Sequence, residues 1–165
     1  MTLGREKILS RQDLLKTVSD LRSRGKTVVF TNGCFDILHL GHVRLLYEAG
    51  LLGDFLVVGI NSDDSVRRLK GPSRPLVPEE DRAEILAALE PVSAVTIFPE
   101  DTPEELISIL KPDIHVKGGD YDIKEIPEAK IVESYGGEVR LIPLVPGHST
   151  TELANKIKNG GGPGL

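Results

Sequence analysis

The sequence contains no tryptophan and only one cysteine, and aromatic residues make up 4% of its 165 positions. A single cysteine cannot form an internal disulfide, which favours a reducing compartment. Few aromatic rings are available for nucleic-acid bases to stack on. The formal net charge of -5 also argues against broad binding to a phosphate backbone, so a nucleic-acid binder is disfavoured.

Long hydrophobic runs are missing as well. Nowhere do about 18 apolar residues follow one another, as a membrane span requires, and the first 25 residues contain no apolar signal core. We therefore expect a soluble, cytoplasmic protein with no membrane partner. A chain of 165 residues is long enough to bury one substantial core.

Short apolar runs alternate with helix-like segments along the chain. The runs resemble buried parallel strands, and the spacing of apolar residues between them is typical of helices packed on a sheet. The predicted strands are Lys26–Thr31, Phe55–Ile60, Val92–Phe98, Asp113–Val116 and Glu138–Ile142. This alternation predicts an α/β fold, with a Rossmann-like, doubly wound five-stranded parallel sheet in a single domain.

The ends of the chain differ from this central pattern. We predict an N-terminal helical extension over residues 1–25, a domain over 26–158, and a disordered glycine-rich tail over 159–165. Within the domain, segment 67–75 contains too much glycine and proline for a regular element. On the helix after it, Arg82 is expected to pair with Asp81 or Glu79.

The turn after the first strand carries two histidines, His39 and His42, at the start of a helix. Residues three apart on a helix share one side, so both rings can face the same space. Gly41 between them lets an anion approach the backbone, and a helix N-terminus attracts anions. Imidazoles placed there could stabilise the charge of a phosphate in a transition state.

The histidine pair is also compatible with two simpler roles. Either ring could merely form a hydrogen bond at the helix end. A zinc site is less favoured, because His115 and His148 lie far along the chain and one cysteine provides no cluster of ligands.

Polar or glycine-rich residues also follow the other predicted strands, and right-handed crossovers bring all of these segments to one edge of the sheet. Lys70, beside Gly71, is a candidate to reach a polyphosphate. Segment 117–120 could border a planar ring, although a plain turn would also account for its glycines. Segment 149–152 reads as a capping box whose hydroxyls and free N–H groups could also hold phosphates.

Two of these segments resemble the signatures of a known superfamily. Residues 35–42 resemble the His-x-Gly-His motif of a nucleotidyltransferase superfamily, and Ser149-Thr150-Thr151 resembles its second, hydroxyl-rich signature. Further similarity at 31–34, 61–63, 68–75, 100–103, 117–121 and 136–139 places residues 26–158 near the branch that adenylylates heptose 1-phosphate.

This resemblance implies transfer of AMP from ATP to D-glycero-β-D-manno-heptose 1-phosphate, giving ADP-heptose for lipopolysaccharide synthesis and pyrophosphate. The attack would be in line and without a covalent intermediate. Mg²⁺ would be carried mainly by the triphosphate. The resemblance also implies a homodimer, which the N-terminal helix could serve. Because Met1 lies only about 25 residues before the first strand, we expect a separate sugar kinase upstream.

The resemblance assigns roles to the residues of this chain that match the positions of the family's motifs. The resemblance implies catalytic roles for His39, His42 and Lys70, and no metal ligand. Substrate contacts are expected from Asp36, Asp63 and Arg74. The residues expected to bind the nucleotide are Asn32, Gly33, Phe35, Gly41, Lys117, Gly118, Asp120, Ser149, Thr150 and Thr151.

One difference from a related branch of the superfamily concerns which nucleotide base is bound. The glycerol-phosphate cytidylyltransferase branch carries Arg-Thr-Glu-Gly before Ser-Thr-Thr, whereas this chain has Val145-Pro146-Gly147-His148. The difference argues against a cytosine preference and leaves His148 without a role. The alternatives are a cytidylyltransferase for a small phosphorylated alcohol such as glycerol 3-phosphate, and an inactive nucleotide-binding regulatory module. The intact histidine pair argues against the inactive module.

Overall fold

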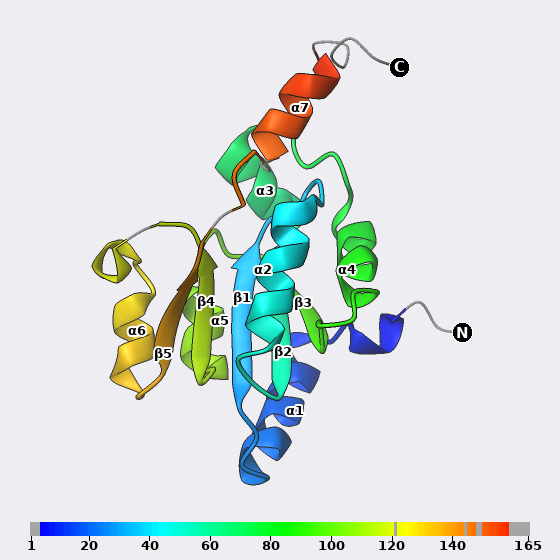
Figure 1. Cartoon of the computed structure of the whole chain (residues 1–165). Coiled ribbons are helices and arrows are strands. Elements are labelled where there is room, and N and C mark those ends of the chain that lie inside the picture. Colours follow the sequence, from blue (N-terminus) through cyan, green and yellow to red (C-terminus); the bar gives the residue numbers. More distant parts are fainter. Residues whose placement is uncertain (1–3, 121, 144, 148–149, 159–165) are drawn as a thin grey trace.

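The computed structural model describes residues 4–120, 122–143, 145–147 and 150–158, and it contains one five-stranded sheet (Figure 1). The strands run in the order β3–β2–β1–β4–β5, and every neighbouring pair is parallel. The predicted fold class is therefore confirmed. The strands are β1 (Val28–Gly33), β2 (Phe55–Asn61), β3 (Ala94–Phe98), β4 (Ile114–Gly118) and β5 (Glu138–Ile142).

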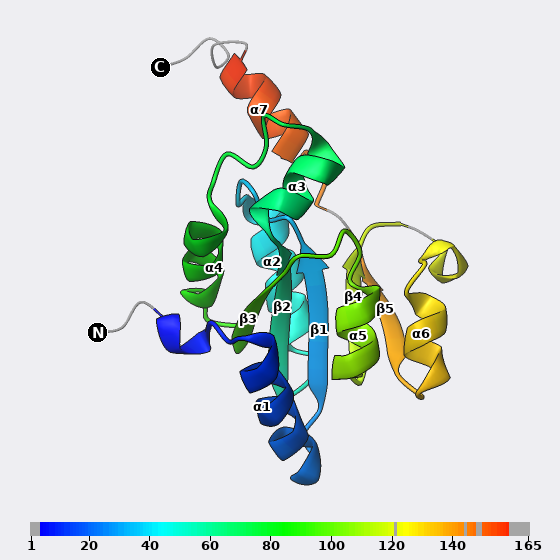
Figure 2. The ribbon, with the colours of Figure 1, turned by 180° about the vertical axis from the view of Figure 1, so that it is seen from behind.

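Helices cover both faces of the sheet (Figures 1 and 2). Helices α2 (Leu40–Gly50) and α4 (Glu79–Ala87) pack on one face. Helices α1 (Arg11–Ser23), α5 (Glu104–Leu110) and α6 (Ala129–Ser134) pack on the other. Successive side chains of β1 enter opposite cores, Val28 and Phe30 on one side and Val29 on the other. Burial on both faces explains why β2 is apolar over residues 55–60, whereas the edge strand β5 exposes Glu138 and Arg140.

Helix α1 begins where the sequence predicts a helix. The Ser10 hydroxyl oxygen accepts a hydrogen bond from the Asp13 backbone N–H, which satisfies one free donor of the first turn. Leu14 and Val18 then fall on one side of the helix and are fully buried against the sheet. The helix is thus part of the packed domain.

Helix α3 (Asp63–Lys70) corrects one expectation, since residues 67–70 of the segment predicted to be irregular form its last turn. The Ser62 side chain caps the helix start, and Gly71 ends it with a φ of 99°, a conformation that glycine adopts without strain. The glycine and prolines of this segment therefore end a helix and shape the loop after it, and do not disrupt the residues before Gly71.

The chain crosses to the other side of β1 between β3 and β4, so the carboxyl ends of β1 and β4 form the switch point where ligands bind in such sheets. Helices α3 and α7 (Thr150–Lys158) lie beyond this edge of the sheet in both ribbon views (Figures 1 and 2). Short 3-10 turns at Arg5–Lys7 and Ile123–Glu125 complete the described elements. Within the described ranges no helix is long and apolar enough to cross a bilayer.

Candidate active site

A cavity of about 410 Å³ opens at the carboxyl ends of β1 and β4, where the switch in strand order predicts a ligand site. Its walls come from residues 32–36, His42 and Leu45 of α2, Lys70, residues 117–118, residues 125–128 and Thr150. Strand-end segments far apart in the sequence therefore converge on one space.

His42 is held on the cavity wall by two rings. Its imidazole stacks on that of His39, with centroids 3.8 Å apart and planes inclined by 24°. It also contacts Phe35, whose ring centroid lies 5.0 Å away. Phe35 has a φ of 48°, which is unusual for a residue with a side chain, and its ring would lie 3.1 Å from a Cβ on Gly33. A side chain at position 33 would therefore push the Phe35 ring from its present place.

The imidazole of His42 is neutral near pH 7. Burial, with smaller contributions from His39 and Lys70, lowers the pKa of His42 to about 4. Its buried Nδ1 has no hydrogen-bond partner among the described residues. A neutral imidazole can donate one hydrogen bond and accept another. The ring is thus available to an incoming polar group, and negative charge near it would favour its protonation.

Lys117 joins the ends of β1 and β4. Its Nζ lies 2.7 Å from Glu128 Oε1 and donates a 3.5 Å hydrogen bond to Asn32 Oδ1. Burial opposes ionisation of Glu128, but the adjacent Lys117 ammonium, with the neighbouring His115 ring, outweighs it and lowers the pKa of Glu128 to about 2. The ion pair fixes the lysine across the switch point.

His115 lies behind this pair and is completely buried. Its ring stacks on Phe30 with centroids 5.6 Å apart, and its Nε2 is 3.7 Å from Glu128 Oε1, which is longer than a hydrogen bond. Burial lowers the pKa of His115, so the neutral form is favoured.

Asp36 anchors the segment that follows α3. Its carboxylate accepts hydrogen bonds from Arg74 Nη1 (2.6 Å), Leu76 N (2.7 Å) and Val77 N (3.0 Å). Asp36 lines the cavity, but Arg74 does not. Substrate contact by either residue stays a prediction, and the observed contacts give both of them a role in holding the loop.

Arg82 does not pair with Asp81 or Glu79, so that expectation is wrong. It is buried, and its Nη2 donates to Asp63 Oδ1 over 2.7 Å. Glu79 instead accepts a hydrogen bond from the Asp63 backbone N–H, and Asp81 is exposed. A buried guanidinium needs buried acceptors, which Asp63 and nearby carbonyl groups provide.

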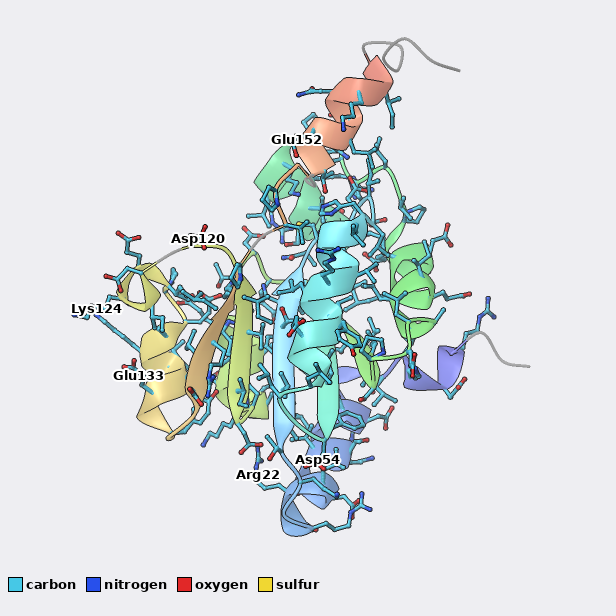
Figure 3. All side chains as sticks on the ribbon, in the orientation of Figure 1. Arg22, Asp54, Asp120, Lys124, Glu133 and Glu152 are labelled. Carbon is cyan, nitrogen blue, oxygen red and sulfur yellow. The ribbon has the colours of Figure 1, made fainter. Side chains whose placement is uncertain are left out.

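Most predicted site residues come together at the cavity. Its walls include the predicted His42, Lys70, Asn32, Gly33, Phe35, Asp36, Lys117, Gly118 and Thr150, whose roles stay predictions. Of the other predicted residues, His39 contacts His42, whereas Gly41, Asp63, Arg74 and Asp120 are not among the lining residues. Figure 3 places Asp120 on the loop after β4. Ser149, His148 and the Thr151 side chain lie outside the described residues, as does segment 159–165.

Sequence reasoning missed one wall of the cavity. The Asp122 side chain caps the Ile123–Glu125 turn by accepting from Lys124 N, and the turn places residues 125–128 at the cavity. In the sequence, only their position after a predicted strand indicated that residues 125–128 could lie at the site. They contain no recognisable motif and no characteristic spacing. The lining residues missed in this way are Glu125, Ile126, Pro127 and Glu128. Cys34 and Leu45 also line the cavity, although no site role was predicted for them.

Comparisons with known proteins agree with this geometry. A family model described as cytidylyltransferase-like matches residues 30–155. A "Bifunctional protein HldE" from Syntrophotalea carbinolica is 58% identical over 151 residues, which cover 92% of this chain and 31% of the relative. One from Nitratiruptor sp. is 59% identical over 140 residues, covering 85% of this chain and 29% of the relative. The chain thus spans about a third of their length.

A solved structure is also similar. The crystal structure of the lipopolysaccharide core biosynthesis protein from Thermoplasma volcanium has a TM-score of 0.59 and 31% sequence identity to this chain. The match covers 73% of this chain and 98% of that one.

Proposed function

The chain belongs to the cytidylyltransferase-like family, and on that premise we propose that it transfers AMP from ATP to D-glycero-β-D-manno-heptose 1-phosphate. The products would be ADP-heptose, for lipopolysaccharide synthesis, and pyrophosphate. The relatives named HldE and the solved lipopolysaccharide core biosynthesis protein support this choice of reaction. The observation that carries it is His42, a neutral imidazole with a free buried nitrogen at a helix start beside the cavity.

The triphosphate would bind where donors and positive charge gather. His42 lies in the first turn of α2, Lys70 at the end of α3, and Thr150 at the start of α7. Helix N-termini favour anions, and lysine neutralises phosphate charge. We place the α-phosphate at His42 and the β- and γ-phosphates near Lys70 and segment 149–151.

Transfer then needs little covalent chemistry from the protein. An oxygen of the sugar phosphate attacks the α-phosphorus in line, and the bond to the pyrophosphate oxygen breaks. Charge grows on the α-phosphate oxygens, and a hydrogen bond from His42 stabilises it more in the transition state than in the ground state. His39 supports the His42 ring by stacking, and the fixed walls hold both substrates in place.

Mg²⁺ would arrive with the nucleotide. The described residues contain no group of three His, Cys, Asp or Glu side chains that could hold a metal. This donor set fits an ion carried by the triphosphate, whose oxygens Mg²⁺ prefers. The bound ion would neutralise charge on the leaving pyrophosphate.

The charges of the cavity suggest where the sugar rings lie. Asp36 is paired with Arg74 and Glu128 with Lys117. Lys70 and Glu125 also line the cavity, and neither forms an ion pair with a described residue. Phosphates would be repelled from Glu125, whereas its carboxylate can accept hydrogen bonds from sugar hydroxyls. We therefore place a hydroxyl-bearing ring of one substrate against residues 125–128.

A homodimer would use the outer face of α2. The apolar residues of α1 pack on the sheet, so α1 is a poor interface. Helix α2 instead exposes Leu40, Val43 and Tyr47 in one row, which Leu51 just after the helix continues. Arg44 and Glu48, one turn apart on this face, form no ion pair with a described residue. If a second copy packed its α2 antiparallel against this one, Arg44 of each copy would face Glu48 of the other. A kinase activity that supplies the sugar 1-phosphate is also part of the proposal.

The decisive experiment is pyrophosphate release with ATP or CTP against heptose 1-phosphate, other sugar 1-phosphates and glycerol 3-phosphate. Rapid release with ATP and heptose 1-phosphate alone is expected. Preference for CTP with glycerol 3-phosphate would establish the cytidylyltransferase instead. Nucleotide binding without release in any combination would indicate an inactive regulatory module.

A further inference from the structure

Arg82 is a buried cation on α4 that does not line the cavity, and only 1% of its side chain is exposed. Its Nε donates to Val77 O over 2.9 Å, and its Nη1 donates to Cys34 O over 2.6 Å and to Asn61 O over 2.8 Å. Its Nη2 donates to Asp63 Oδ1 over 2.7 Å. One guanidinium therefore holds four other residues.

These four acceptors belong to different segments around the cavity. Cys34 lies in the turn that leads to the histidines, and Asn61 ends β2. Asp63 begins α3, and Val77 lies in the loop between α3 and α4. Because a guanidinium presents its N–H groups in one rigid plane, it fixes the directions of all four segments at once.

Asp36 makes a second set of contacts to the loop after α3. It is buried in the turn before His39 and holds Arg74, Leu76 N and Val77 N. Two buried groups of opposite charge thus tie the loop after α3 to the turn before α2. Lys70 is the last residue of α3, so its position relative to His42 depends on these ties.

We propose that Arg82 is a positioning residue, which sets Lys70 of α3 relative to His42 of α2 for a nucleoside triphosphate that bridges them. Arg82 touches no substrate, and the inference rests on the proposed function. Such a role accounts for a buried arginine at this position, because a buried ion pair is often no more stabilising than apolar side chains of the same size. Apolar residues do fit on this side of α4, because Ala83, Leu86 and Ala87 of the same helix pack in the core.

The first test is Arg82→Lys, which keeps the charge and removes the planar fork. We expect kcat/KM for ATP to fall at least tenfold while the circular dichroism spectrum stays native. A control of matched thermal stability is chosen from Ile107→Val and Leu106→Ala on α5, on the opposite face of the sheet. The control should keep wild-type kcat/KM. Equal activity losses in Arg82→Lys and the control would overturn the proposal.

The second test asks whether Arg82 acts through Lys70. Dissociation constants for ATP and for CTP, without acceptor, are measured for Arg82→Lys, Lys70→Ala and the double variant. We expect Arg82→Lys to weaken binding severalfold in the wild-type background and less than twofold beside Lys70→Ala. Additive losses, or wild-type affinity in Arg82→Lys, would contradict the proposal.

Binding also separates this inference from the reaction itself. A protein that binds ATP with this coupling but releases no pyrophosphate refutes the proposed function and leaves the role of Arg82 standing. If Arg82→Lys fails to fold, Asp63→Asn removes the charged acceptor with little change of shape. The same non-additivity with Lys70→Ala is expected of it, and additive effects of Asp63→Asn would reject the inference.

Discussion

The two walls of the cavity are built differently. On the His42 side, the turn after β1, the start of α3 and the loop before α4 are joined by the buried groups Asp36 and Arg82. On the opposite side, segment 122–128 contains the short 3-10 turn Ile123–Glu125, and most of its residues are exposed. The segment is held by the buried Ile126 and by the ion pair of Glu128 with Lys117 of β4. The first wall is preorganised as transition-state stabilisation requires, and the second resembles a recognition loop.

This contrast implies that the two walls have different roles, one in the reaction and one in substrate affinity. Changes on the His42 wall should affect the chemical step or the binding of the triphosphate. Changes on the 122–128 wall should affect affinity or local stability and leave the chemistry intact.

The largest effect is expected from His42→Ala. Loss of one preorganised donor typically costs ~2.7–4 kcal/mol of transition-state stabilisation, so kcat should fall by a factor of roughly a hundred or more. Steady-state kinetics on protein with a native circular dichroism spectrum measure this. Near-normal turnover would remove His42 from the mechanism.

Lys70→Ala should weaken the use of ATP by about tenfold in KM, because a charge-assisted contact to phosphate is lost. The matched control is Arg67→Ala, which removes the same charge from an exposed position on the same helix, where Arg67 pairs with Asp64. Kinetics at varied ATP concentration distinguish the two. An equal change in both variants would mean that Lys70 contributes only long-range charge.

Glu128→Gln should change stability and its dependence on pH. The pKa of Glu128 in the folded protein is about 2, below its usual 4.5, so the ionised form stabilises the fold above pH 4.5 and this contribution is lost as the pH falls toward 2. We expect the variant to lose on the order of 2 kcal/mol of unfolding free energy at pH 7.

Urea unfolding at pH 7 and pH 3 measures this loss. The difference between wild type and variant should shrink at pH 3. Glu133→Gln, on the exposed side of α6 (Figure 3), is the control and should show no such difference. A gap between wild type and Glu128→Gln that persists at pH 3 would show that the charge is unimportant.

Glu125→Gln should raise KM for either ATP or the sugar phosphate a few-fold, with kcat nearly unchanged, since a carboxylate accepts sugar hydroxyls better than an amide does. Substrates lacking single hydroxyls, such as 2′-deoxy-ATP, show which ring it contacts. Lys124→Ala, on the same turn (Figure 3), should leave both KM values unchanged. Unaltered KM values in Glu125→Gln would place the sugar elsewhere.

The smallest effect on catalysis is expected from Tyr47→Glu, which puts a charge into the exposed row on α2. It should convert a dimer to a monomer in sedimentation experiments and leave kcat close to that of wild type. Ile157→Glu, on the exposed side of α7, is the control. A wild-type chain that sediments as a monomer at micromolar concentration would contradict the proposed interface.

The comparison of the walls also shows which parts of the site could be predicted. The His42 wall carries a local pattern, because two histidines around a glycine at a helix start are visible within a few residues. The wall of residues 122–128 carries no such pattern, and Glu128 looks like any acidic residue near the start of α6. Its partner Lys117 lies on a different element, so the pair exists only after folding.

Arg82 also has partners that the sequence did not reveal, although the helix that carries it was predicted. Local spacing suggested the neighbouring carboxylates Glu79 and Asp81 as partners, yet the side chain is directed inward to Asp63 and three carbonyl groups. A helical pattern identifies the buried side of a helix from its apolar residues, and it does not identify a long charged side chain on that side.

Local patterns in the sequence predicted the alternation of strands and helices, the parallel sheet, and a candidate phosphate site at His39–His42, because apolar periodicity and helix-start chemistry are local properties. The tertiary structure decided which side chains meet across the switch point. It paired Lys117 with Glu128, Asp36 with Arg74 and Arg82 with Asp63. Such pairs join residues up to 38 positions apart, and burial makes each charge require a partner that no sequence spacing specifies.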